Sequence, residues 1–137
     1  MSVLLTTLEL SPRPDLGILV VRWADDAPAS QLQSDYTTIL GVANKHGLGR
    51  WLLDVRRRDQ LAPEIGQWTT MVFYPEAAAQ LEPHCLRISV LCSPARLAVY
   101  EADPTQQHYL AFGLAPERTY QMRLFIEEKA AMEWLLA

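Results

Sequence analysis

The feature that most constrains the fold of this 137-residue chain is a short apolar run, RWLLDV at residues 50–55, with helical patterns on either side. Such a run is typical of a strand buried on both faces, as found between helix layers in parallel sheets. Before it, apolar residues recur at helical spacing between Pro28 and Gly47, and after it Pro63 is placed to open a second helix. The chain is therefore predicted to be an α/β protein with this strand at its centre.

Four further strands and several helices complete the prediction. The expected strands are residues 4–10, 17–23, 50–55, 85–92 and 119–125, the first two forming a hairpin. The expected helices are residues 28–47, 63–72, 105–112 and 127–136, with a turn or two more at 76–81 after a break at Tyr74-Pro75, while residues 97–100 fit helix or strand. The order ββαβαβαβα predicts one domain over residues 1–137, a mixed and largely parallel sheet covered by about four helices.

Two local patterns predict finer details. Ser30 and Gln33 have the spacing of a capping box, so they are expected to begin the first helix. Within residues 85–92, apolar positions alternate with Arg87 and Ser89, which indicates an unevenly covered or edge strand.

The two cysteines predict no redox or metal chemistry. Cys85 and Cys92 are seven residues apart in the expected strand, which would put their side chains on opposite faces about 23 Å apart, at roughly 3.3 Å per residue. They cannot form a disulfide with each other there and are expected to be buried, inert thiols. The sequence has no CxxC, HExxH or His/Cys cluster, so no metal or other cofactor is expected.

Charge and composition exclude several classes of partner. The 12 Lys and Arg residues against 16 Asp and Glu give a net charge of −4, and no basic run exceeds three residues, so nucleic acid is not expected as the main partner. No apolar stretch approaches the length of a membrane span, and the first residues lack the features of a signal peptide. The expected location is the cytoplasm.

Three segments together carry a family resemblance: ILVVRW at 18–23, WLLDVRRR at 51–58 and RLFIEEKAAMEWL at 123–135. On these segments the chain resembles the SpoIIAA-like group of STAS domains, small α/β modules related in shape to Sec14-type lipid-binding domains. The resemblance covers nearly the full length in element order. It implies a four- or five-stranded sheet with helices mainly on one side, and a role in binding rather than catalysis.

The chain departs from this family at one functional position. Anti-sigma-factor antagonists of the superfamily carry a phosphorylatable serine at the start of the helix after the central strand. The matching residues 55–66 hold no Ser or Thr, and Thr69 and Thr70 lie well inside the predicted helix, away from its free amides. A phosphorylation switch of that type is not expected. A domain this short and aromatic is also expected to fill its core rather than enclose a lipid.

The strongest polar candidates are Arg56, Arg57 and Arg58, in the loop after the central strand. Ligands commonly bind at the carboxyl ends of strands in open α/β sheets, and arginines bind anions through two parallel hydrogen bonds. One hypothesis is thus a site for an anion or an acidic partner. The alternative is that these arginines pair with neighbouring acids and merely solubilise the loop.

Trp68 and Tyr74, if exposed, would extend the arginine loop into an aromatic, arginine-rich patch of the kind that dominates protein interfaces. Burial of Trp68 against the sheet is the alternative. The preferred function is therefore a non-enzymatic protein-binding or regulatory module that binds an unidentified protein partner through residues 56–74. Homodimerisation through an exposed helix face is left open.

Two other functions are weighed against this one. The arginine loop and residues 93–113 could frame a pocket for an acidic or amphipathic small molecule or lipid-type ligand. A hydrolase is least favoured, because no nucleophile has a base at recognisable spacing. It would gain support from an exposed cysteine beside His84 or His108 with a lowered thiol pKa.

Overall fold

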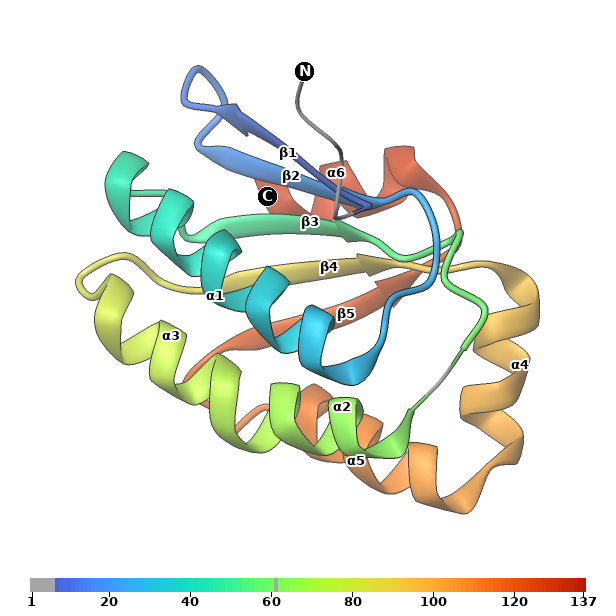
Figure 1. Ribbon diagram of the computed structural model, residues 1–137. Helices are drawn as coiled ribbons and strands as arrows, with labels where there is room; N and C mark the ends of the chain where they lie inside the picture. Colours follow the sequence, from blue (N-terminus) through green and yellow to red (C-terminus); the bar gives the residue numbers. More distant parts are fainter. Residues whose placement is uncertain (1–6, 61) are drawn as a thin grey trace.

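The structure is a computed structural model that describes residues 7–60 and 62–137. It contains a five-stranded sheet in the order β1-β2-β3-β4-β5 (Figure 1), with β1 antiparallel to β2 and all other neighbours parallel. The strands are β1 (Leu8–Arg13), β2 (Ile18–Trp23), β3 (Arg50–Asp54), β4 (Arg87–Leu91) and β5 (Gln121–Phe125). The predicted α/β class and mixed sheet are confirmed, although residues 4–6 of the first predicted strand lie outside the described residues.

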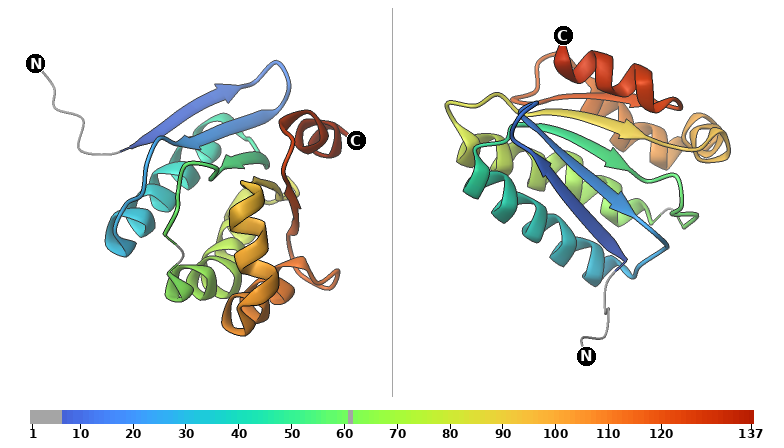
Figure 2. Two further views of the ribbon diagram at one scale, coloured as in Figure 1. Left: turned by 90° about the vertical axis from the view of Figure 1, so that its right-hand side faces the viewer. Right: turned by 90° about the horizontal axis from the view of Figure 1, so that it is seen from above.

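Helices follow each of the strands β2 to β5. They are α1 (Ala29–His46), α2 (Pro63–Trp68), the π-helical η1 (Thr69–Phe73), α3 (Tyr74–Leu81), α4 (Pro94–Ala102), α5 (Pro104–Leu114) and α6 (Glu128–Leu136). Each parallel connection moves one strand along the sheet in the same direction, and because such crossovers are right-handed, their helices lie on one face. The last helix, α6, covers the opposite face (Figure 2).

The two faces of the sheet have separate cores because side chains alternate along each strand. Trp51 and Leu53 of β3 belong to the larger core beneath α1, α2 and α3. Leu52, between them, is fully buried in the smaller core together with Ala131 and Leu135 of α6. The central strand is thus covered on both faces, as its apolar run predicts.

The prediction that β4 is an edge or unevenly covered strand is wrong. β4 lies between β3 and β5, and the hydroxyl of Ser89 is buried where it donates to the carbonyl of Ala131 at 2.9 Å. The guanidinium of Arg87 lies 4.2 Å from the centre of the Trp134 ring. The polar side chains of β4 contact helix α6. Their alternation with apolar residues therefore does not mean that this face of the strand is exposed to solvent.

The predicted break at Tyr74-Pro75 is also wrong, because α2, η1 and α3 run on without a gap from 63 to 81. The Tyr74 N–H donates to the carbonyl of Thr69, five residues earlier, which is the wider turn of a π-helix. Pro75 has no N–H to offer within this continuous helix, and the Thr70 carbonyl five residues before it accepts a hydrogen bond from the Tyr120 hydroxyl at 2.6 Å. The hydroxyls of Thr69 and Thr70 donate to carbonyls one turn earlier, at 2.8 and 2.7 Å.

Helix α1 ends as predicted but begins differently. Gly47 closes it in the left-handed conformation at a φ of 66°. At its start the N-cap is Pro28, without a side-chain hydrogen bond, so the capping box of Ser30 and Gln33 is not formed. Both residues are exposed in the first turns of the helix.

The segment that the sequence defined least forms two helices with side-chain caps. Ser93 accepts a hydrogen bond from the Arg96 N–H at the start of α4, and Asp103 caps α5. The predicted helix at 105–112 is confirmed within α5, and residues 97–100 are helical. Among the described residues, no helix is both long enough and apolar enough to cross a membrane.

Candidate functional site

The three consecutive arginines after β3 lie in three different environments. Arg56 pairs with acidic side chains, Arg57 is exposed, and Arg58 is only 4% exposed. They therefore do not act as one basic patch.

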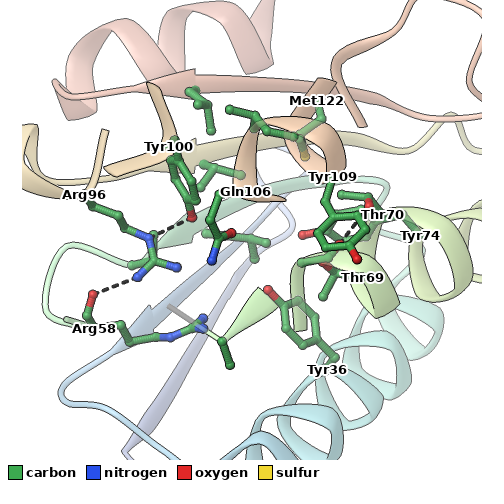
Figure 3. A pocket seen from close by; sticks show the side chains of 17 residues that line it. Tyr36, Arg58, Thr69, Thr70, Tyr74, Arg96, Tyr100, Gln106, Tyr109 and Met122 are labelled. Carbon is green, nitrogen blue, oxygen red and sulfur yellow. Dashed lines mark hydrogen bonds between the residues drawn. The ribbon is translucent and has the colours of Figure 1, made fainter. Parts of the chain in front are cut away.

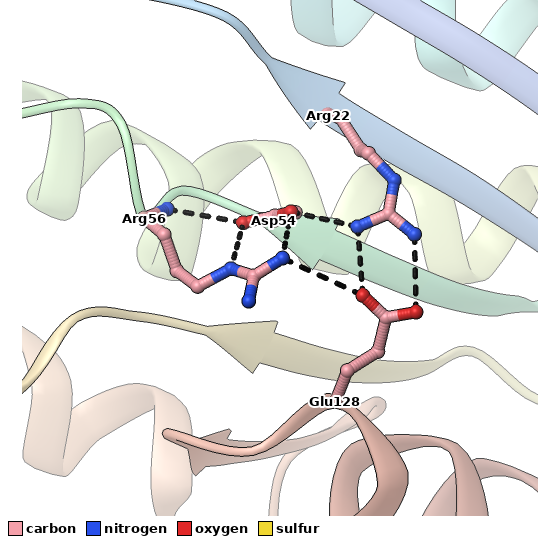
Figure 4. Close-up of polar contacts among 4 residues, drawn as sticks. All are labelled: Arg22, Asp54, Arg56 and Glu128. Atoms are coloured by element: carbon pink, nitrogen blue, oxygen red, sulfur yellow. Dashed lines mark hydrogen bonds and ion pairs between the residues drawn. The ribbon is translucent and has the colours of Figure 1, made fainter.

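Arg56 belongs to an ion network on the α6 side of the sheet (Figure 4). Asp54 accepts hydrogen bonds from Arg56 Nε and Nη2 at 3.0 and 2.9 Å and from Arg22 Nη1 at 2.7 Å. Arg22 also donates to both carboxylate oxygens of Glu128, at 2.8 and 3.1 Å. Two cations face two anions, so the network is balanced and ties β2 and β3 to α6.

The acids of this network are held in their ionised form. Burial alone would raise the pKa of Asp54, but hydrogen bonds from Arg56 and Arg22 outweigh it, and the pKa lies below its ordinary value. The hydrogen bond from Arg22 is the main reason that the pKa of Glu128 is lowered too. The pairing alternative for the arginine loop thus holds for Arg56, with one partner from a distant helix.

Arg58 points instead into a cavity of about 80 Å³ on the other face of the sheet (Figure 3). The walls come from α1, the loop after β3, the helices between β3 and β4, and both α4 and α5. We call it the tyrosine–arginine cavity, after Tyr36, Arg58, Tyr74, Arg96, Tyr100 and Tyr109.

Arg58 is a buried cation held by an aromatic ring. Its guanidinium lies 4.9 Å from the centre of the Trp23 ring, a cation–π contact. Its backbone carbonyl accepts a hydrogen bond from Arg96 at 2.7 Å. Within residues 7–60 and 62–137, no carboxylate forms an ion pair with its side chain.

Arg96 is the second buried cation, 8% exposed. Its Nε donates to the hydroxyl of Tyr100 at 2.8 Å, and its Nη1 donates to the Arg58 carbonyl. It too has no ion pair with a carboxylate in the described part of the chain. The backbone of the arginine loop and helix α4 are therefore fastened together at the cavity.

Two tyrosines of the cavity, Tyr74 and Tyr100, are held in their neutral form by burial. Burial raises the pKa of Tyr74 well above its ordinary value, and burial likewise raises that of Tyr100 despite the nearby Arg96. None of the described lining residues is Asp, Glu or His. The wall therefore carries two positive charges, from Arg58 and Arg96, and no formal negative charge.

Most of the remaining wall is apolar, although Thr69, Thr70 and Gln106 also line it. The sheet contributes Leu53, Val55 and Val90, and β5 adds Met122 and Leu124. A molecule in the cavity would meet cations at one end and an apolar floor elsewhere.

The aromatic residues predicted to extend the arginine loop do not form an exposed patch with it. Tyr74 is 3% exposed and lines the cavity. Trp68 is half-buried. Its ring stacks on that of Phe73, with 5.1 Å between the ring centres, and lies edge-on to the ring of Tyr36, with 5.9 Å between the ring centres. The hypothesis of a protein contact through exposed Trp68 and Tyr74 therefore loses its main surface, whereas residues 93–113 do frame a pocket.

Sequence reasoning missed Arg96 and the tyrosines of α4 and α5. The available signal was the repeated pair Ser93-Pro94 and Asp103-Pro104, in which a capping residue precedes a proline at the first helical position. That pattern predicts two short helices after β4 and would have put Arg96 in the first turn of one.

Cys92 is not an activated nucleophile. Cys92 is buried, and burial raises the pKa of its thiol, the opposite of activation. The prediction that both thiols are buried is wrong for Cys85, which is exposed because β4 begins only at Arg87. The residues that the structure describes include no group of three His, Cys, Asp or Glu placed to hold a metal ion.

No family model, curated protein or solved structure matches this chain significantly. The STAS-like assignment therefore stays an expectation from the sequence.

Proposed function

We propose that this protein is a non-enzymatic binding domain whose ligand is a small anionic molecule in the tyrosine–arginine cavity. The observation that carries the proposal is Arg58, a guanidinium 4% exposed that lines a cavity and forms no ion pair with a carboxylate among the described residues. Arg96 supports it from a second element.

The energetic argument concerns a largely buried guanidinium that has no carboxylate partner among the described residues and that reaches the cavity. Removing a cation from water costs several kcal/mol unless an opposite charge or hydrogen bonds offset the loss. The contact with Trp23 offsets part of this cost for Arg58, since a desolvated cation–π contact contributes about 2 kcal/mol. A bound anion would offset the remainder, which makes an anion the best-matched occupant of the cavity.

The position of the cavity fits the same function. Arg58 and Arg96 follow the carboxyl ends of the neighbouring parallel strands β3 and β4. Open α/β sheets bind ligands beyond the carboxyl ends of their strands. The loop and residues 93–113, weighed in the sequence as a second possibility, are thus the better-supported site.

A thermal-shift screen of small anions and their neutral analogues tests the proposal. Gly66 lines the cavity, and a Cβ there would stand 3.7 Å from Gln106 and Tyr109, so Gly66→Leu extends a side chain into the space. Gly41→Leu is the matched control, because Gly41 is exposed on α1 and faces open space.

An anion at 100 times its Kd should stabilise the native state by about 2.7 kcal/mol. We expect such a shift in the wild type and in Gly41→Leu, and its loss in Gly66→Leu. Absence of any anion-specific shift, or a shift that survives Gly66→Leu, would contradict the proposal.

A further inference from the structure

The class of anion follows from which donors of the cavity are still free. Arg96 uses Nε on the Tyr100 hydroxyl and Nη1 on the Arg58 carbonyl, which leaves Nη2. The side chain of Arg58 makes its cation–π contact with Trp23 and forms no hydrogen bond within the described residues. The whole guanidinium of Arg58 and the Nη2 group of Arg96 are therefore available to bind a ligand.

Phosphate groups usually bind to free backbone amides at the start of a helix. Three helices begin at the cavity, since Ala62, Arg96 and Gln106 line it. The Arg96 amide is already bound by the Ser93 hydroxyl at 3.1 Å, and the Gln106 amide is shared with Asp103.

The remaining helix start offers little to a phosphate either. Helix α2 begins with Pro63, which has no N–H. At α5, the carboxylate of Asp103 accepts from the Thr105 amide at 2.9 Å and adds a negative charge of its own. Of the helix-start amides at the cavity, those of Arg96 and Gln106 are thus engaged, and Pro63 has none.

A carboxylate needs fewer donors and matches those that are present. Its two oxygens lie in a plane and accept two parallel N–H bonds from one guanidinium, a geometry that arginine favours over lysine. The fork of Arg58 can supply this pair of bonds, with Arg96 Nη2 beside it.

The volume and the lining of the cavity limit the size and character of the rest of the ligand. A water needs about 10–15 Å³ on this scale, so a cavity of about 80 Å³ holds several waters and no long acyl chain. The surrounding tyrosine rings and the apolar side chains of the sheet fit a single ring or a short branched chain.

We infer that the ligand is a monocarboxylate with a compact apolar body, its carboxylate held by Arg58 and Arg96. The inference rests on the proposed function and narrows it to one chemical class. Benzoate, neutral benzamide and phenyl phosphate are suitable probes, because they share a ring and differ in the polar group.

Calorimetry or NMR titration of the three probes tests the inference. For the wild type we expect benzoate to bind at least about tenfold more tightly than benzamide, as a charge-assisted hydrogen-bond pair predicts, and more tightly than phenyl phosphate. In Arg58→Met the preference for benzoate over benzamide should fall to the small part that Arg96 alone supports. In Arg58→Lys the preference should fall less, because the positive charge remains while the paired N–H donors are lost. Arg57→Met, a change at the exposed neighbour, should leave it unchanged.

Benzamide also serves as a folding control. A variant that still binds benzamide has kept its cavity, so loss of benzoate binding alone reports the charge at Arg58. Equal binding of benzoate and benzamide, tighter binding of phenyl phosphate, or binding of none of the probes would overturn the inference. The proposed function would then still stand if other anions stabilised the wild type and Gly41→Leu but failed to stabilise Gly66→Leu.

Discussion

The ring of Trp23 lies beneath the guanidinium of Arg58, with the carbon of the guanidinium 4.9 Å from the ring centre. The ring is itself fixed, because its Nε1 donates to the buried carboxylate of Asp35 at 2.9 Å. A chain of contacts thus runs from α1 through β2 to the cation that lines the cavity. Trp23 is therefore a positioning residue for the proposed site.

Trp23→Phe should weaken both stability and anion binding. The variant keeps an aromatic ring but removes the donor to Asp35, a buried hydrogen bond to a charged group worth about 1.5–3 kcal/mol. Urea denaturation should show a loss of that size. Trp68→Phe, at a half-buried ring of α2 that packs against the same core, is the control and should lose less.

Two glycines near the cavity should respond oppositely to alanine. At Gly66 a Cβ meets only ordinary contacts, and alanine favours the helix by about 0.5–1 kcal/mol, so Gly66→Ala should raise Tm. At Gly113 a Cβ would lie 2.7 Å from Met122 and 2.9 Å from Thr70, so Gly113→Ala should cost about 1–3 kcal/mol. Equal melting temperatures for the two variants would show that the packing around Gly113 yields freely.

The ion network of Asp54 and Glu128 should make stability depend on acid. Both have pKa values lowered in the folded state, so their contribution is full above the unfolded values near pH 4 and is lost as pH falls through the folded values. Asp54→Asn should cost about 1.5–3 kcal/mol at pH 7, because two partly exposed arginines lose hydrogen bonds to a charged acceptor.

The pH profile separates this network from general charge effects. Asp54→Asn should show a smaller loss of stability than the wild type between about pH 4 and pH 2, measured by urea midpoints. Glu133→Gln, at an exposed position of α6, provides the control. Parallel profiles for Asp54→Asn and the wild type would contradict the role given to Asp54.

The two thiols should differ sharply in reactivity. Cys85 is exposed and should react with a maleimide in the native protein, whereas Cys92 is buried and should react only after unfolding. Mass spectrometry should therefore count one adduct in buffer and two in denaturant. Cys85→Ser should abolish the native adduct.

The fold was largely readable from the sequence, and its failures have local causes. The apolar run at 50–55 predicted a central strand, and β3 (Arg50–Asp54) is covered on both faces. The predicted helix break at Pro75 was wrong because a π-helical turn, with a hydrogen bond spanning five residues, directly precedes the proline and the helix continues. A single hydrogen bond that joins residues five apart instead of four cannot be recognised from the spacing of apolar side chains.

The site was less predictable, because it depends on which way each side chain turns. Arg56 and Arg58 are two residues apart in a run of three arginines, yet one contacts α6 and the other the opposite layer. The sequence alone does not distinguish Arg56 from Arg58. For Arg96, the Ser93-Pro94 pair could have predicted its place at the start of a helix, but not its hydrogen bond to the Arg58 carbonyl, 38 residues away in the sequence.

The strand order described above also bears on how the chain acquires its structure. Every neighbouring pair in the sheet is also a consecutive pair along the sequence, so the sheet can grow one strand at a time from any adjacent pair. Only the β1–β2 hairpin joins residues close in sequence, and each parallel pairing must first close a long loop through its helices, which makes it the slower step. The pair Arg22 and Glu128, 106 residues apart, closes only after the last strand has arrived, and should be among the final contacts to form.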